Sequence, residues 1–342
     1  MKHYYIEGEW INALMNVFSN LGLDTEEVTN GIEGFEGGRL LAEHRLEVSS
    51  ARKVWHQADN VAKDPLLGFK VGSVQNYRAI GALAPVIWHS PNVRTALKNL
   101  TTFQSLVSES GSFHVYERQE NGEKVEYCEY IAKLSSVSIN VHQVLSVVVG
   151  TIGIIRAISN NMVDVKRLYV PRSLDADLLA KNLVCNVVNR DGNFAICFAT
   201  QQFDLPILGC DDNLYRINIA YAEELLNAKK IAVALVDSIK ALIESGGFSR
   251  VNIEYVELSL GLHKRTLQRN LLEQGTSFRQ IKEEVLKTHA VNLLLSEKLA
   301  IEVLATHLGY SEPSAFHRAF KSWFGVTPRK FCRISHYYTY TN

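Results

Sequence analysis

Apolar residues recur at helical spacing near the start of the chain. Those of the segment 5–23 lie three or four residues apart on one side of a helix that Gly22 would end: Ile11, Leu14, Met15, Phe18 and Leu21. The segments 49–64 and 93–110 have the same character and predict two further helices. The chain therefore opens with a group of helices.

Alternating apolar and polar residues take over in the segments 112–119 and 124–134, on either side of a Glu-Asn-Gly-Glu turn. This pattern predicts a β-hairpin. A long apolar stretch then predicts a buried helix over 136–160. Three further strand-like segments follow it, the last two separated by a turn of sequence Asn-Arg-Asp-Gly-Asn: 163–171, 183–188 and 194–200. Helices followed by strands and a long helix predict an α+β N-terminal domain, residues 1–228.

The most apolar part of the chain, residues 144–158, is interrupted by Arg156 and preceded by His142. It is shorter than the ~20 apolar residues that a membrane-spanning helix needs. We interpret it as a core helix and expect no contact with a membrane.

From Ile231 onward the pattern is helical and is punctuated by glycine. It predicts a helix over 231–247, a short helix with Asn252 as N-cap, a second short helix, and a helix of about five turns with Ser277 as N-cap. The region 229–342 is therefore expected to form a separate all-α domain.

One motif occurs twice in this domain. The segment 253–262, with sequence IEYVELSLGL, recurs 48 residues later as IEVLATHLGY at 301–310. Beyond the glycine turn the offset is 49, which aligns Leu267 with Phe316 and Arg269 with Arg318. Each copy is a helix, a glycine turn and a helix, the layout of a helix-turn-helix unit. We predict such units at about 252–273 and 301–324, joined by a long linker helix.

Details of the second copy fit this layout. Ala305 and Gly309 suit a close helix crossing, and glycine accepts a left-handed backbone. Ser311 is expected to cap the next helix, and Pro313 to lie in its first turn, where a missing N–H costs little.

The second helix of each copy has an apolar side and an outward polar side. Leu267 and Leu271 would anchor the first copy, and Phe316, Phe320 and Trp323 or Phe324 the second. The outward residues would be Lys264, Arg265, Gln268 and Arg269 in the first copy, and Ser314, His317, Arg318 and Lys321 in the second. Arginine and glutamine suit bidentate contacts to guanine and adenine. An ordinary solvated helix face is the alternative, which two matching copies disfavour.

Composition adds a charge asymmetry. The 342 residues, 46% of them hydrophobic, suit two or three domains. The formal net charge is zero, but residues 231–342 hold 14 Lys and Arg against 10 Asp and Glu. That leaves 22 against 26 for the rest of the chain. The C-terminal part is thus the one suited to phosphate.

Other chemistry is not indicated by sequence motifs. The five cysteines are scattered without zinc-like spacing, which is typical of reduced thiols in a cytoplasmic protein. The N-terminus lacks the layout of a signal peptide. No GxSxG, P-loop, GxGxxG or HExxH motif occurs, so we expect no catalytic residues, no metal and no cofactor.

The C-terminal stretch resembles the DNA-binding domain of AraC/XylS-family transcription regulators over about 231–331, most specifically in RTLQRNLLEQGTSF (265–278) and LGYSEPSAFHRAFKSWFGVTPRKF (308–331). The resemblance implies base or backbone contacts by Arg265, Gln268 and Arg269 and by Ser314, His317 and Arg318. It implies phosphate contacts by Lys321, Arg329 and Lys330.

Two residues depart from the family pattern in the first unit. Glu257 stands where a small residue is usual, and His263 where a small capping residue is usual. A carboxylate at the helix crossing must turn to solvent or find a partner, so the packing and specificity of this unit are left open.

The N-terminal region, in particular 77–108, loosely resembles the regulatory domain of AraC-type regulators of ornithine utilisation and virulence, rather than the compact sugar-sensing barrel of the arabinose regulator. The resemblance implies a cytoplasmic activator that binds double-stranded promoter DNA and responds to a small molecule. RNA polymerase and a second copy of the chain are further expected partners. Two alternatives stay open: a regulator with a purely architectural N-terminal domain, and an enzyme with a DNA-binding appendage.

Overall fold

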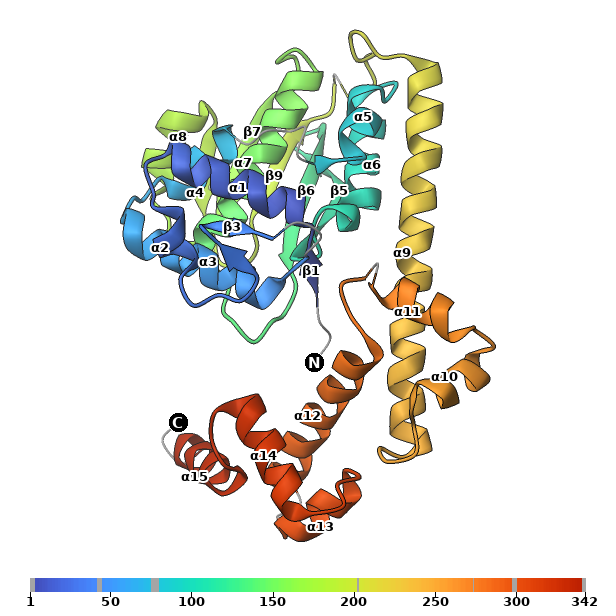
Figure 1. Cartoon of the computed structure of the whole chain (residues 1–342). Helices are drawn as coiled ribbons and strands as arrows, with labels where there is room; N and C mark the ends of the chain where they lie inside the picture. Colours follow the sequence, from blue (N-terminus) through green and yellow to red (C-terminus); the bar gives the residue numbers. More distant parts are fainter. Residues whose placement is uncertain are drawn as a thin grey trace. The chain divides into compact units, whose positions relative to one another are not determined.

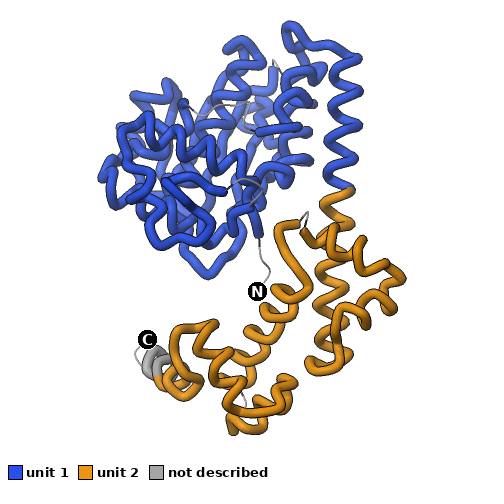
Figure 2. The backbone as a smooth tube through the Cα atoms, in the orientation of Figure 1, with its two compact units in different colours: residues 1–227 blue, residues 228–342 orange. Residues whose placement is uncertain are grey.

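The computed structural model describes residues 4–41, 45–74, 80–201, 203–272, 274–296 and 300–339. The chain divides into two compact units, Met1–Asn227 and Ala228–Asn342 (Figure 2). The elements of each unit are labelled in Figure 1.

Four helices and two small sheets begin the first unit. The helices are α1 (Gly8–Asn20), α2 (Thr25–Thr29), α3 (Val48–Ala62) and α4 (Leu67–Val74). Strand β1 (Tyr5–Ile6) pairs with β4 (Leu46–Glu47), and β2 (Phe35–Glu36) pairs with β3 (Arg39–Leu40). The predicted helix within 5–23 is confirmed as α1, and Gly22 follows its end with a φ of +85°. The Asp24 side chain then caps α2.

A five-stranded sheet forms the centre of the unit, with the order β5-β6-β9-β7-β8. The bounds are β5 Gly111–Glu120, β6 Glu123–Ala132, β7 Val165–Val170, β8 Asn186–Asn189 and β9 Ala195–Ala199. The predicted hairpin is confirmed, since β5 and β6 pair antiparallel up to Glu120 and Glu123. The helices before and between these strands are α5 (Leu83–Trp88), α6 (Val93–Phe103), the short 3-10 helix η2 (Gln104–Leu106), α7 (Val141–Ile158) and α8 (Ala176–Leu183).

The last strands are arranged differently from their order in the sequence. Segments 183–188 and 194–200 flank a turn, yet β8 pairs only with β7, in parallel, while β9 lies between β6 and β7. The parallel pairing requires a crossover, which α8 provides by burying Leu179 and Leu183. The sequence pattern does not predict this helix, which lies between β7 and β8.

Helix α7 is the core helix that its apolar sequence predicts. It packs on β6 and β9 and crosses α4 closely. Gly68 and Gly72 allow the two helices to approach closely at this crossing. A Cβ on Gly72 would lie 2.6 Å from the Ser146 carbonyl oxygen. Among the described residues, α7 is the one helix long and apolar enough to span a membrane, but 72% of that stretch is buried inside the fold.

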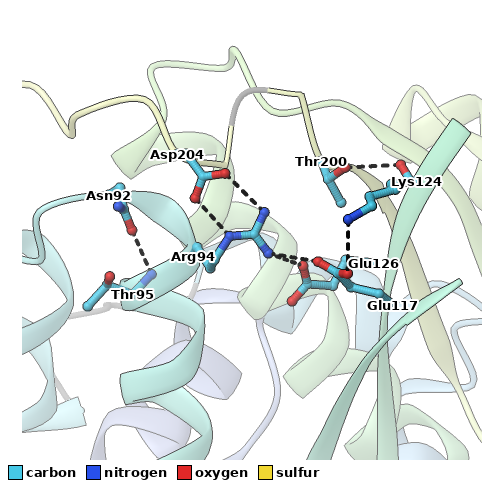
Figure 3. Close-up of polar contacts among 8 residues, drawn as sticks. All are labelled: Asn92, Arg94, Thr95, Glu117, Lys124, Glu126, Thr200 and Asp204. Carbon is cyan, nitrogen blue, oxygen red and sulfur yellow. Dashed lines mark hydrogen bonds and ion pairs between the residues drawn. The ribbon is translucent and has the colours of Figure 1, made fainter.

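An ion-pair cluster joins α6 to the sheet (Figure 3). The Arg94 guanidinium lies 3.2 Å from the Glu117 carboxylate, 3.0 Å from that of Glu126 and 2.8 Å from that of Asp204. The hydrogen bond with Asp204 raises the pKa of Arg94. Burial raises the pKa of Glu126, although Arg94 acts in the opposite direction. The cluster holds two strands and a loop against one helix.

Helix α9 extends from Asp212 to Gly246, and the division between the units falls within it. The sequence pattern predicted only its second half, beginning at Ile231. No glycine or proline occurs between 212 and 231, so the expected boundary lacks the residues that most strongly end a helix. The division of the chain into domains at 228 stays a proposal.

Six further helices form the second unit: α10 (Ile253–Leu260), α11 (Lys264–Leu272), α12 (Phe278–Ser296), α13 (Ile301–His307), α14 (Pro313–Phe324) and α15 (Pro328–Thr339). They share one hydrophobic core with the end of α9. Ser277 caps α12 as predicted, accepting a hydrogen bond from the Gln280 N–H at 3.2 Å. The predicted Ser311 cap is wrong: Glu312 is the N-cap of α14 and makes no capping hydrogen bond.

Candidate nucleic-acid interface

Helices α10 and α11 form the first helix-turn-helix unit. Asn252 caps α10, its side chain accepting a hydrogen bond from the Tyr255 N–H at 2.8 Å. Gly261 ends the helix with a φ of +65°, which a side chain would disfavour. Leu267 and Leu271 are buried and anchor α11. The predicted anchors of this copy are confirmed.

The unusual Glu257 is the partner that α11 needs at its start. Its carboxylate accepts a hydrogen bond from the Lys264 N–H at 3.1 Å and lies 3.5 Å from Nδ1 of His263. The first N–H groups of a helix lack partners within the helix. The two departures from the family pattern therefore compensate each other, because Glu257 supplies the cap that His263 does not.

Helices α13 and α14 form the second unit. Gly309 makes the turn with a φ of +83° and lies against the backbone of Ser249, where a Cβ would meet the Ser249 nitrogen at 2.8 Å. Phe316 and Phe320 are fully buried. Both the glycine turn and the predicted aromatic anchors are confirmed.

An aromatic cluster fixes α14 against α15. The Phe320 ring lies 4.6 Å from that of Phe324 and 5.5 Å from that of Phe331, between centroids. On the other side, the Lys287 ammonium lies 6.0 Å from the centroid of Trp323. Such contacts make the orientation of α14 well defined, so its polar face has a fixed direction.

The outward faces of α11 and α14 are polar and exposed. Arg265, Gln268 and Arg269 are exposed on α11, and Ser314 and Arg318 on α14, while His317 is half-buried beside Phe316. In the described part of the chain, no hydrogen bond or ion pair engages the side chains of Arg265, Gln268, Arg318 or Lys321. These donors are therefore available to another molecule.

Lys264 differs from the other outward residues because its ammonium lies 2.7 Å from the Glu254 carboxylate. This hydrogen bond raises the pKa of Lys264 and lowers that of Glu254. The pair could not be predicted from the face pattern, since Glu254 lies on the preceding helix. A DNA contact by Lys264 has to compete with this carboxylate.

The predicted phosphate-contact residues lie on α14 and at the start of α15. Lys321, Arg329 and Lys330 are all exposed. Lysine and arginine at such positions can neutralise phosphate without reading a base.

Helix α12 joins the two helix-turn-helix units and packs in their common core. The Lys240 ammonium on α9 lies 2.8 Å from the Glu284 carboxylate, and Lys282 donates to the Val251 carbonyl at 2.7 Å. Burial lowers the pKa of Lys282. The separation of the two helix-turn-helix units is thus set by packed helices rather than by a flexible linker.

Two family models match the chain. One, described as a helix-turn-helix domain, matches residues 258–334. The other, described as the N-terminal arabinose-binding domain of AraC transcription regulator, matches residues 22–191. We expected the N-terminal region to be unlike the sugar-sensing domain of the arabinose regulator, but it matches the model of that domain. The main sheet here is nevertheless an open row of five strands.

Several known proteins are similar. An uncharacterized HTH-type transcriptional regulator of Mycobacterium tuberculosis is 34% identical over 167 residues, 47% of this chain and 48% of that protein. Virulence regulon transcriptional activator VirF of Shigella flexneri is 30% identical over 111 residues, 32% of this chain and 42% of VirF. The match thus spans about half the length of these relatives or less. The crystal structure of transcriptional regulator CdpR from Pseudomonas aeruginosa aligns with 96% of this chain and 98% of its own, at 18% identity and a TM-score of 0.49.

Tandem helix-turn-helix units are typical of transcription regulators, and the similar proteins reported above are transcriptional regulators. The N-terminal match agrees with this class. The chain thus combines a helix-turn-helix domain with a region that matches the N-terminal domain of AraC transcription regulators.

Proposed function

We propose that this protein is a sequence-specific DNA-binding transcription regulator. The observation that carries the proposal is the pair of helices α11 and α14, whose arginine-bearing faces are exposed while their apolar faces share one core. Arg265, Gln268 and Arg269 on one helix, and Ser314, His317 and Arg318 on the other, are assigned to base or backbone contacts. Lys264 is assigned to the same surface, and Lys321, Arg329 and Lys330 to phosphate.

The linker helix supports a bipartite site. With 19 residues, α12 spans ~28 Å at 1.5 Å per residue. Successive major-groove segments on one side of the duplex lie ~34 Å apart. Two recognition helices joined by such a linker suit two neighbouring segments of one site.

Selection of binding sites from a random DNA pool, with the purified full-length protein, tests the proposal. Recovery of two conserved blocks about one helical turn apart is expected. Recovery of a single block, lost in Arg318→Ala but not in Gln268→Ala, would show that α11 reads no bases. A pool without enrichment would argue against sequence-specific binding.

The N-terminal unit is proposed to sense a small molecule and to control an activator that works with RNA polymerase in the cytoplasm. VirF, which is similar over 32% of this chain, is named an activator. A ligand controls such a protein only through different affinities for two states, so ligand-dependent DNA affinity is the property to measure. A regulator with a purely architectural N-terminal unit would show none.

Helix α9 is the proposed dimerisation element. Leu214, Ile217, Tyr221 and Ile231 are 43%, 65%, 52% and 72% exposed, and their spacing matches positions a and d of a heptad repeat. Ala222, on a different side of the helix, is buried in the core of the first unit. The stripe formed by Leu214, Ile217, Tyr221 and Ile231 therefore faces away from that core. A second copy of α9 is the partner that such a stripe suits.

Sedimentation of the full chain tests this element. Ile217→Lys is expected to shift a dimer to a monomer, because it places a charge in the apolar seam. Glu223→Lys on another exposed side of the helix serves as the control. A wild-type monomer at micromolar concentration would refute the assignment.

A further inference from the structure

A cavity of about 110 Å³ lies within the N-terminal unit and is lined mainly by residues of α1, α3, α5, α6, η2, β5, β6 and α7. Most of its wall is apolar, and Trp10 and Trp55 contribute large rings to it. An engineered cavity of about 150 Å³ binds benzene, so this one suits a body of about one small ring.

One side of α7 gives the cavity its polar character. The residues of this helix that line the cavity occupy a single helical stripe: Gln143, Ser146, Val147, Gly150, Thr151 and Ile154. The polar residues of the stripe stand in an otherwise apolar helix, and a packed core would gain more from apolar side chains there. Their placement on the cavity side indicates a use for them.

Gln143 is the distinctive member of this stripe. Its side chain is 7% exposed, and its Oε1 has no hydrogen-bond partner among the described residues. A buried acceptor without a partner is unfavourable. The hydroxyls of Ser146 and Thr151 donate to the carbonyls of Gln143 and Val147, at 2.8 and 2.9 Å. Within this stripe, the amide oxygen of Gln143 is therefore the acceptor that a ligand donor would satisfy.

A second polar group lies on another wall. Ser110 Oγ is 2.8 Å from Ser108 Oγ and 3.0 Å from the Tyr130 hydroxyl, and all three residues line the cavity. Burial raises the pKa of Tyr130, so its phenol is neutral at physiological pH. These hydroxyls satisfy one another, unlike the Gln143 amide oxygen.

Among the lining residues that the structure describes, none carries a charge. The buried Arg52 is not one of them, and its Nη atoms donate to the carbonyls of Val137 and Lys133. An anionic ligand without a counter-charge is strongly unfavourable in an apolar site. The described part of the lining therefore favours an uncharged molecule over a carboxylate or phosphate.

From this geometry we infer that the N-terminal unit binds a small, uncharged, mainly apolar molecule that donates a hydrogen bond to Gln143 Oε1. This rests on the proposed function, in which the unit is a sensor, and it specifies the chemical class of the effector. The apolar walls supply most of the affinity through burial, and the Gln143 acceptor selects a ligand that carries a hydroxyl or N–H group.

Calorimetric titration of the full-length protein with three probes that share a methyl-substituted phenyl ring tests the inference. The probes are 4-methylphenol, toluene and 4-methylbenzoate: a neutral donor, a neutral molecule without a donor, and an anion. We expect saturable binding of 4-methylphenol, with toluene about fivefold weaker, which corresponds to one hydrogen bond of about 1 kcal/mol, and no binding of 4-methylbenzoate. A rise in the unfolding temperature with 4-methylphenol is the second readout.

Two variants change residues that line the cavity, and a third changes a residue outside it as a control. Gln143→Met keeps the length of the side chain but removes its acceptor, so the affinities for 4-methylphenol and toluene should become equal. Val147→Phe fills the cavity and should abolish the binding of both. Gln57→Met, on α3 and not among the lining residues, should leave the wild-type preference unchanged.

Equal affinities in the wild type, a preference for 4-methylbenzoate, or a preference that persists in Gln143→Met would each overturn the inference. So would a failure of 4-methylphenol to bind. Because DNA binding is measured separately by site selection, these outcomes leave the proposed DNA-binding function standing. Loss of site selection with intact 4-methylphenol binding would instead refute the proposed DNA-binding function and leave the inferred ligand site standing.

Discussion

The cap that Glu257 provides to α11 leads to a quantitative prediction about two residues together. Glu257→Ala places the usual small residue at the helix crossing but removes the acceptor that lies 3.1 Å from the Lys264 N–H. Loss of a helix N-cap costs about 0.5–2 kcal/mol. His263→Ser adds a side chain that can cap α11 from the usual position, so it should be neutral in the wild type and restore stability in the Glu257→Ala background.

Native-state hydrogen exchange of the 264–272 peptide is the suitable assay, because it reports the local opening of α11. With a central value of about 1 kcal/mol, Glu257→Ala should speed exchange about fivefold. The double variant Glu257→Ala/His263→Ser should return to near the wild-type rate, which corresponds to a coupling of about 1 kcal/mol between the sites.

A peptide from α14, such as 314–323, serves as the internal control and should exchange equally in all four proteins. Strict additivity of the two substitutions would refute the reasoning, since it would show that Glu257 and His263 do not serve the same helix terminus. Slower exchange in Glu257→Ala would mean that the carboxylate strains the crossing rather than capping α11.

Three other predictions concern DNA recognition and the N-terminal core. Arg318→Ala should weaken specific binding by about 1–3 kcal/mol and relax the preference at one position, whereas Lys321→Ala should weaken all sequences alike and reduce the salt slope by about 1; binding titrations at several salt concentrations distinguish the two. Because burial raises the folded-state pKa of Glu126, ionisation of Glu126 lowers stability as the pH rises from its ordinary value near 4.5 through the raised one. Glu126→Gln should therefore increase the unfolding temperature near neutral pH, with a smaller gain below pH 4.5, and a loss at neutral pH would mean that the pair with Arg94 dominates. Gly72→Val should destabilise the N-terminal unit by about 1–3 kcal/mol or more through overpacking, measured by thermal unfolding, while Gly81→Val, whose added Cβ would meet no atom within 4 Å, tests the cost of a strained backbone alone.

Much of the local structure was determined by the sequence itself. The two copies of the helix-turn-helix motif, their anchors Leu267 and Phe316, and the caps at Asn252 and Ser277 depend on residues a few positions apart. The β5–β6 hairpin and the core helix α7 likewise follow from periodicity over short segments. Such features are encoded locally because helix and strand periods, turns and caps act over one or two turns of chain.

Tertiary structure alone decided how distant segments meet. The insertion of β9 between β6 and β7 depends on pairings more than 25 residues apart in sequence, and the crossover through α8 follows from it. The full length of α9 depends on packing of Tyr215 and Ala222 rather than on a stop signal. The cap from Glu257 and the unpartnered amide of Gln143 are likewise set by neighbours from other elements. A residue type indicates which hydrogen bonds a side chain can make, but only the packed fold determines whether the partner is present.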